Sequence, residues 1–210
     1  IKWANNILET EPNPSDSAST STKMFSDIKN GKVQIGVSNA LIKLKNQGLP
    51  IVSITSDLAG STGVSGFQKA FSESTIDVGV AESNMISVAA GFSKNGFIPV
   101  VDTFAQFGIT KGNLPLIMAN LSGAPVIGIF SHTGYQDAAD GASHQSTTYF
   151  SAVSNIPHTK IFCLSNAEQA EALISEEVES FHQEQTNGQT PDSRIFFLGR
   201  ENFPHHYNKD

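Results

Sequence analysis

The chain has 210 residues, a length that suits one α/β domain or two very small ones. Its 13 basic and 20 acidic residues give a formal net charge of −7, which argues against a nucleic-acid-binding surface and against a basic membrane patch. The single cysteine, Cys163, cannot form an internal disulfide. The sequence has neither an apolar run of membrane-spanning length nor a signal-peptide pattern. We therefore expect a cytoplasmic protein that binds neither nucleic acid nor membrane.

The sequence changes from polar and aperiodic to periodically apolar near residue 24. Residues 1–23 are polar, hold several prolines and serines and show no period, so we expect a linker or arm there. Residues 24–204 have the apolar periodicity of one folded domain. We expect residues 205–210 to begin a linker to a further C-terminal domain.

Helical and extended patterns alternate along this domain. The first helical pattern has apolar residues at Val33, Val37, Leu41 and Leu44, and Gly48 ends it. Two further helical patterns have apolar faces, and a third spans residues 167–182. The two faces comprise Met85, Val88, Ala89 and Phe92, and Leu114, Ile117, Met118 and Leu121.

Six short apolar runs between the helical patterns predict buried strands. They span residues 51–55, 76–80, 97–101, 125–130, 160–164 and 194–198. Strands that alternate with helices form parallel sheets covered on both faces. We therefore expect a three-layer α/β/α fold with a central, mostly parallel sheet of about six strands.

Residues capable of binding or catalysis follow these runs. They are Asp57, Ser61, Glu82, Phe104, Phe107, His132, Asp140, His144 and Arg200. The carboxyl ends of parallel strands meet at one edge of the sheet, where ligands of such folds bind. Each residue also has a structural interpretation: Glu82 as a helix-start acid, Asp57 as a turn residue, the two phenylalanines as core. Their shared position at strand ends favours a site.

Several common enzyme motifs are missing. The sequence contains no phosphate-binding loop of the G-x-x-x-x-G-K-[ST] type and no G-x-G-x-x-G after the first strand. His132 and His144 lack helical spacing and a thiolate partner, which argues against a zinc site. No G-x-S-x-G motif exists for a hydrolase serine.

Four segments together resemble the pyrimidine-binding domain of transketolase, over about residues 24–204. They are SDLAGST, VGVAESNMISVAAGFSKNGFIPVVDTFAQF, SHTGYQDAADGASHQS and GRENFP. The resemblance implies the thiamine-diphosphate-binding pyrimidine-domain type of α/β fold. It also implies transfer of a two-carbon ketol unit between sugar phosphates, with thiamine diphosphate and Mg²⁺ or Ca²⁺ as cofactors. The metal and diphosphate would be held by another domain or subunit, in a dimer or higher assembly.

The resemblance also assigns expected roles to individual residues. Glu82 matches the glutamate that hydrogen-bonds a pyrimidine nitrogen of the cofactor. Phe104 and Phe107 match the aromatic residues that pack on the pyrimidine ring, and Asp57 and Leu58 match positions near the cofactor.

The remaining matches concern the substrate. Asp140 and His144 match residues that bind the hydroxyls of the donor sugar, and we expect them to act with Glu82 as the catalytic group. Ser61, His132 and Arg200 match the cluster that binds the substrate phosphate.

Two alternatives remain open. One is a piece of an enzyme like 1-deoxy-D-xylulose-5-phosphate synthase, which shares the domain, although GRENFP is closer to the transketolase phosphate segment. The other is a non-catalytic scaffold or regulator with the same fold. The presence of Glu82, Phe104, Asp140 and His144 argues against the scaffold, because a scaffold does not need them.

Overall fold

A parallel six-stranded sheet forms the centre of the molecule. The computed structural model describes residues 30–204, so the expected arm at 1–23 and tail at 205–210 lie outside the described residues. The strand order is β3-β2-β4-β5-β7-β6, and each neighbouring pair is parallel. In chain order the strands are β2 (Ile51–Thr55), β3 (Thr75–Asp77), β4 (Ile98–Phe104), β5 (Ile127–Ser131), β6 (Thr159–Leu164) and β7 (Ser193–Leu198). All six expected strands are therefore present.

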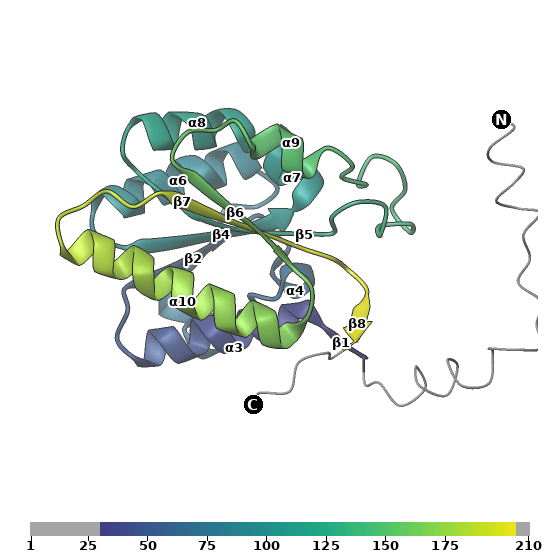
Figure 1. The fold of residues 1–210 in the computed structure, drawn as a ribbon, viewed down its shortest axis with the longest axis horizontal. Coiled ribbons are helices and arrows are strands. Elements are labelled where there is room, and N and C mark those ends of the chain that lie inside the picture. Colours follow the sequence, from purple (N-terminus) through teal and green to yellow (C-terminus); the bar gives the residue numbers. More distant parts are fainter. Residues whose placement is uncertain (1–29, 205–210) are drawn as a thin grey trace, which may run out of the picture.

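Helices cover both faces of this sheet (Figure 1). One face packs against α3 (Val33–Asn46), α4 (Ala59–Thr62), α5 (Ser65–Ala70) and α10 (Ala167–Thr186). The other packs against α6 (Glu82–Lys94), α7 (Ala105–Thr110), α8 (Asn113–Leu121) and α9 (Tyr149–Val153). A short 3-10 helix, η1 (Ser72–Ser74), precedes β3. The expected three-layer α/β/α architecture is confirmed.

Helix α3 shows how the apolar period determines this packing. Val33, Val37, Leu41 and Leu44 are all fully buried in the core cluster on its side of the sheet. Residues spaced three or four apart share one helix face, so a single apolar stripe faces the strands. The helix ends just before Gly48, whose φ of +93° is a conformation that glycine adopts without steric cost.

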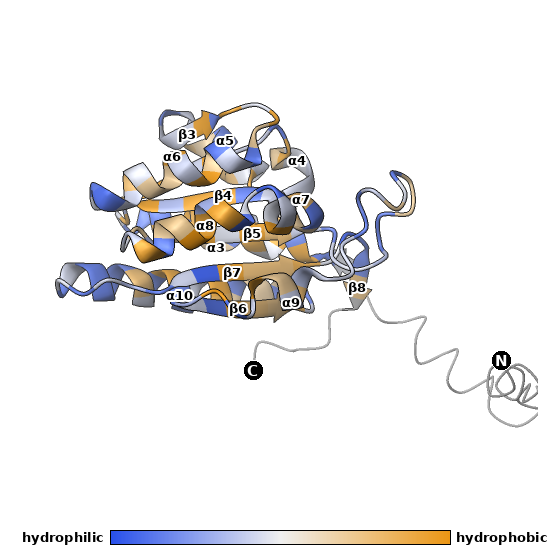
Figure 2. Ribbon diagram, turned by 90° about the horizontal axis from the view of Figure 1, so that it is seen from above, coloured by the Kyte–Doolittle hydropathy of each residue, from blue (hydrophilic) through white to orange (hydrophobic). Residues whose placement is uncertain are grey.

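Helix α8 differs from the expected orientation. It buries Leu116 and Ala119, whereas Leu114 and Leu121 on the expected core face are 67% exposed. Figure 2 looks onto this layer and shows α8 largely in the hydrophobic colour. The nine residues NLPLIMANL are apolar nearly all round, so the sequence pattern contains no polar face to orient the helix.

Hydrogen bonds supply the orientation instead. The Asn120 side chain donates to Thr159 Oγ1 at 2.8 Å and accepts from Ser193 Oγ at 2.6 Å. These contacts attach the end of α8 to the starts of β6 and β7, and so determine which side of the helix faces inward.

A small antiparallel ribbon lies beyond the carboxyl end of β7. Strand β1 (Asn30–Lys32) pairs with β8 (Asn202–Pro204). The ribbon brings the beginning of the described chain next to its end (Figure 1) and places residues 199–201 at the carboxyl edge of the sheet. Within residues 30–204, no helix has the length and apolar character needed to cross a membrane.

Candidate functional site

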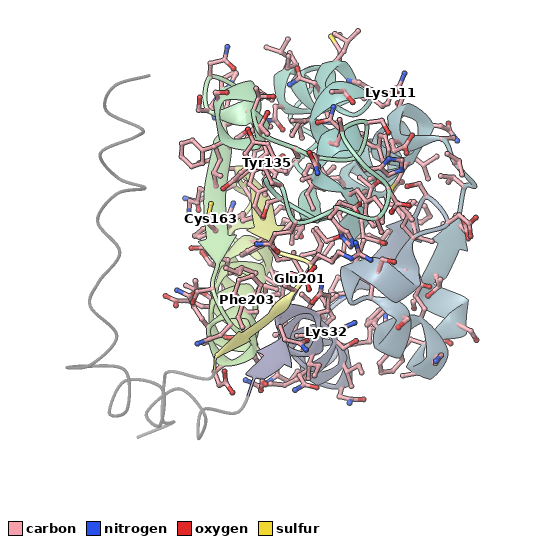
Figure 3. All side chains as sticks on the ribbon, turned by 90° about the vertical axis from the view of Figure 1, so that its right-hand side faces the viewer. Lys32, Lys111, Tyr135, Cys163, Glu201 and Phe203 are labelled. Carbon is pink, nitrogen blue, oxygen red and sulfur yellow. The ribbon has the colours of Figure 1, made fainter. Side chains whose placement is uncertain are left out.

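A pocket of about 350 Å³ opens at the carboxyl ends of β2 and β4. Its lining residues are Ser56, Asp57, Leu58, Val80, Glu82, Phe104, Phe107, Lys111 and His144. Figure 3 looks onto this edge of the sheet, with Lys111 labelled. The structure thus brings together six of the expected site residues, which come from four separate segments of the chain.

Glu82 is the first residue of α6 and is 8% exposed. Within the described part of the chain, no hydrogen-bond donor reaches its carboxylate. The Glu82 oxygens are not among the fully buried polar atoms of residues 30–204 that lack a hydrogen-bond partner, so the carboxylate reaches the open space of the pocket. Its position on the pocket wall makes it available to a ligand that offers a donor.

Two phenylalanines form a flat apolar wall beside Glu82. Phe104 ends β4 and Phe107 lies on α7; their rings are nearly parallel, at 21°, with centroids 6.2 Å apart. The His132 ring stacks on Phe104 at 3.9 Å, and the His144 ring meets Phe107 edge-on at 5.0 Å. The wall therefore suits a flat aromatic ligand.

The loop after β2 is held by a buried carboxyl group, Asp102. This side chain is fully buried and accepts hydrogen bonds from Thr62 Oγ1 at 2.6 Å and Thr55 Oγ1 at 3.0 Å. The same two threonines bond to Leu58: its N–H donates to Thr55 Oγ1, and its carbonyl accepts from Thr62 Oγ1. Asp102 thereby fixes the turn that carries Asp57 and Leu58 to the pocket.

Burial raises the pKa of Asp102 to about 7, although the hydrogen bonds from Thr62 and Thr55 act to lower it. The charge of Asp77 raises it further. We did not expect Asp102 to matter from the sequence. The available signal was a lone acid within the apolar run that forms β4.

The two histidines differ in their surroundings. His132 is buried, its Nδ1 lies 2.8 Å from Ser131 Oγ, and its φ is +61°. Burial lowers the pKa of His132, the nearby charge of Asp137 opposes this, and that of Arg200 adds to it. His144 is partly exposed at the pocket, with its Nδ1 3.0 Å from Ser143 Oγ.

Four expected residues lie outside the pocket lining. Ser61 on α4 and Asp140 in the loop after β5 are exposed. His132 adjoins the pocket through its stacking on Phe104. Arg200 forms an ion pair with the fully buried Asp137 at 2.9 Å, a contact that the sequence analysis did not foresee.

Three further residues line the pocket that were not predicted from the sequence: Ser56, Val80 and Lys111. Val80 precedes the α6 segment, is 79% exposed and lines the pocket. Lys111 places a cation at the pocket rim, next to the end of α7.

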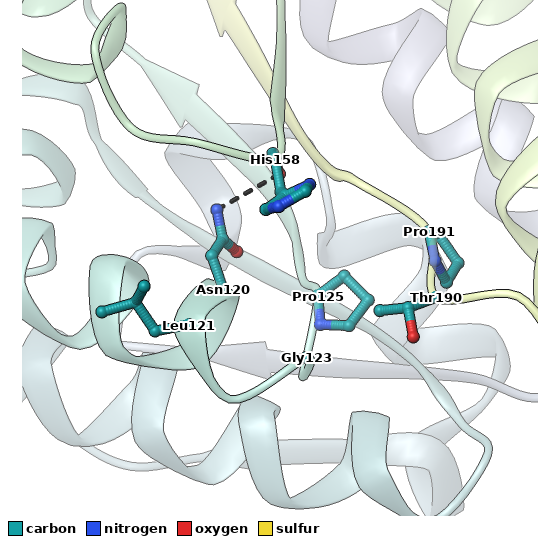
Figure 4. Close-up of a pocket in the computed structure, with 7 residues that line it drawn as sticks. All are labelled: Asn120, Leu121, Gly123, Pro125, His158, Thr190 and Pro191. Carbon is teal, nitrogen blue, oxygen red and sulfur yellow. Dashed lines mark hydrogen bonds between the residues drawn. The ribbon is translucent and has the colours of Figure 1, made fainter.

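A second cavity, of about 220 Å³, lies at the amino-terminal ends of the strands (Figure 4). Asn120 donates from Nδ2 to the His158 carbonyl there, at 3.2 Å. His158 is exposed and lies 3.2 Å from Asp192. This cavity is at the opposite edge of the sheet from Glu82 and holds none of the expected site residues.

No group of three or more His, Cys, Asp and Glu side chains within residues 30–204 is arranged to hold a metal ion. The pocket nevertheless suits an organic ring. It combines an apolar wall with few polar groups, as ligand sites do. An unpartnered carboxylate faces that wall, so the residues present fit the pyrimidine end of thiamine diphosphate.

Sequence comparisons give relatives for this chain. It is 34% identical over 126 residues to a transketolase C-terminal section from Methanocaldococcus jannaschii, covering 59% of this chain and 39% of that protein. It is 31% identical over 139 residues to 1-deoxy-D-xylulose-5-phosphate synthase of Corynebacterium diphtheriae, covering 66% of this chain and 22% of that enzyme. The chain thus spans about a fifth to two fifths of these relatives' length.

Similar solved structures include a split-gene transketolase, an inactive β4 tetramer, at TM-score 0.67 and 26% identity. The match covers 87% of this chain and 56% of that one. Transketolase of Campylobacter jejuni has the same fold, at TM-score 0.67 and 19% identity, over 99% of this chain and 32% of that one.

The family described as transketolase, pyrimidine binding domain matches residues 32–202, which is nearly all of the described structure. That match agrees with the strand order and with the pocket at the carboxyl edge. The chain belongs to the transketolase pyrimidine-binding domain family.

Proposed function

We propose that this chain is the pyrimidine-binding part of a cytoplasmic transketolase, which moves a two-carbon ketol unit between sugar phosphates. Its cofactors are thiamine diphosphate and Mg²⁺ or Ca²⁺. The diphosphate and metal are held by a separate domain or subunit, in a dimer or higher assembly. The observation that carries the proposal is the unpartnered Glu82 carboxylate beside the Phe104–Phe107 wall.

Glu82 holds a proton at a pyrimidine ring nitrogen, and its position at the start of α6 keeps the carboxylate aimed into the pocket. Phe104 and Phe107 hold the ring flat and exclude water. Thiamine diphosphate, when bound, supplies carbanion chemistry that no side chain can provide. The protein contributes orientation and control of the proton.

Five of the remaining residues act on the sugar phosphates, and two lie beside the cofactor. His144, at the pocket rim, and Asp140, in the loop that also carries His144, bind the donor hydroxyls. His132, Ser61 and Arg200 contact the substrate phosphate, for which the planar guanidinium of arginine is well suited. Asp57 and Leu58 line the cofactor side of the pocket.

A second candidate is 1-deoxy-D-xylulose-5-phosphate synthase. A relative of that name is 31% identical to this chain over 139 residues. The same pocket would hold the same cofactor, so the two candidates differ in product rather than in the roles of Glu82 and the phenylalanines.

An activity assay separates the candidates. The chain is mixed with a diphosphate-binding transketolase section, thiamine diphosphate and Mg²⁺, and both ketol transfer between sugar phosphates and formation of 1-deoxy-D-xylulose 5-phosphate are measured. We expect ketol transfer that requires both proteins. Formation of only the deoxy sugar would support the second candidate. A folded complex with bound cofactor and neither activity would support a non-catalytic scaffold and contradict both.

A further inference from the structure

Arg200 is already engaged by an acid of its own chain. Its Nη1 lies 2.9 Å from Oδ1 of Asp137, and the Asp137 side chain is fully buried while that of Arg200 is 37% exposed. The other Asp137 oxygen, Oδ2, is buried and has no hydrogen-bond partner. The charge of Asp137 is therefore balanced chiefly by this one guanidinium.

The neighbouring residue, Gln136, fixes the main chain at the same place. Its Oε1 accepts from the Arg200 N–H at 2.7 Å and from the Glu201 N–H at 3.3 Å. Figure 3 labels Tyr135 and Glu201, the residues that flank this contact between the loop after β5 and the turn before β8. Arg200 is thus held through both its backbone and its side chain, and its guanidinium cannot swing freely toward or away from Asp137.

The local charge is unfavourable for a phosphate dianion. Four charged groups act on the neighbouring His132. Arg200 is positive, and the other three, Asp137, Asp140 and Glu201, are negative. Burial lowers the pKa of His132, so this imidazole is neutral at pH 7 and adds no positive charge. Among the described residues that act on His132, one cation is therefore outnumbered by three carboxylates.

We propose that Asp137 is a specificity-determining residue that holds and partly neutralises Arg200, and so weakens the preference of this site for phosphorylated substrates. The proposal rests on the proposed function only in that Arg200 faces substrate. The effect of Asp137 on anion affinity follows from its contact with Arg200 and is measurable without catalysis.

The test is a titration of the full chain with inorganic phosphate, followed by NMR of the arginine side-chain N–H signals. Asp137→Asn keeps the shape and an acceptor for Arg200 but removes the charge. We expect phosphate to bind about two- to fivefold more tightly to Asp137→Asn than to the wild type, the scale of a partly exposed charge pair. The gain should vanish in Asp137→Asn with Arg200→Gln.

Two further variants make the result decisive. Asp192→Asn, at the opposite edge of the sheet, removes an equal charge and should leave phosphate binding at the wild-type level. If Asp137→Asn does not fold, Asp137→Ser also provides a small neutral acceptor and replaces it. Unchanged or weaker phosphate binding in a folded variant, or an equal gain from Asp192→Asn, would overturn the proposal.

The assembled enzyme provides a second readout. With Asp137→Asn, the KM for the unphosphorylated acceptor divided by that for the phosphorylated one should rise several-fold. If neither the wild type nor Asp137→Asn shows ketol transfer, the proposed function fails. The phosphate titration then still decides whether Asp137 weakens anion binding. A tighter phosphate site with an unchanged KM ratio would show that Arg200 does not face substrate and would overturn the specificity claim.

Discussion

The buried position of Asp102 inside the sheet makes the stability of the folded chain depend on pH. Burial raises its pKa from 3.8 to about 7. Between those pH values the folded chain retains a proton that the unfolded chain has released, so the free energy of unfolding falls as pH rises from about 4 to about 7 and then levels off. The full change is on the order of 4 kcal/mol for this group.

We predict that Asp102→Asn removes this part of the pH dependence, because the amide does not titrate and still offers an oxygen to the Thr55 and Thr62 hydroxyls. Urea unfolding at several pH values measures the effect. Asp140→Asn, an exposed acid, is the control and should retain the wild-type pH profile. Equal slopes for wild type and Asp102→Asn would show that the buried carboxyl is ionised throughout.

The sequence predicted that residues following the strands would lie near one another, and this is confirmed for six of them, which line one pocket. Glu82, Phe104 and His144 were predicted in this way, and the pocket brings them together. Asp102 and Asp137 were not predicted, because their importance comes from partners 40 and 63 positions away in the chain, Thr62 and Arg200. A single sequence contains no record of such pairings, which depend on strand register and loop packing.

At the scale of elements, one buried cation joins α10 to β7. The Arg194 side chain is fully buried, with Nε 3.2 Å from Glu177 and Nη2 2.5 Å from Glu184. Its guanidinium also lies 5.4 Å from the centre of the Phe181 ring, and Nη1 donates to the Asp192 carbonyl. Among the described residues, removal of this cation leaves Glu184 without an ion-pair partner and Glu177 with only Lys160, at 3.6 Å.

We predict that Arg194→Ala lowers the free energy of unfolding by about 3–5 kcal/mol, the usual cost of breaking a buried ion pair from one side. Lys160→Ala is the matched control, because Lys160 contacts the same Glu177 at 3.6 Å but is 41% exposed. It should cost less than about 1 kcal/mol. Denaturant unfolding that gave the two variants equal stability would contradict this assignment.

Strands were predicted better than helix faces. The six apolar runs were short, bounded by turn residues and separated by helical patterns, and each became a strand of the sheet. Helix α8 was predicted with the wrong face inward, because its apolar residues surround the axis and Asn120 determines the orientation through contacts that only the folded chain makes. The β1–β8 ribbon has three residues a strand, too few for a pattern.

At the scale of the whole molecule, the pocket holds only one end of the proposed cofactor. Residues 30–204 provide a flat wall and a carboxylate but no cluster of metal ligands. Charged diphosphate groups gain much of their affinity from metal ions and charge-assisted hydrogen bonds.

We therefore predict that the isolated chain binds thiamine diphosphate with a dissociation constant of about 10 μM or weaker, and that a diphosphate-binding section tightens binding at least tenfold. Isothermal titration calorimetry of the isolated chain, and of the chain mixed with the diphosphate-binding section, measures both dissociation constants. Each titration is run with and without Mg²⁺. Submicromolar, magnesium-dependent binding by this chain alone would contradict the prediction and place the diphosphate site within it.

The central claim is that Glu82 controls a proton on the bound pyrimidine ring. It is tested most directly by hydrogen–deuterium exchange at the thiazolium carbon of thiamine diphosphate in the assembled enzyme. Glu82→Gln should keep the fold and most of the cofactor affinity, yet slow this exchange by about a hundredfold or more, the scale of a positioned acid–base group. Glu73→Gln, an exposed acid outside the pocket, should exchange at the wild-type rate. Wild-type exchange in a folded, cofactor-loaded Glu82→Gln enzyme would contradict the account.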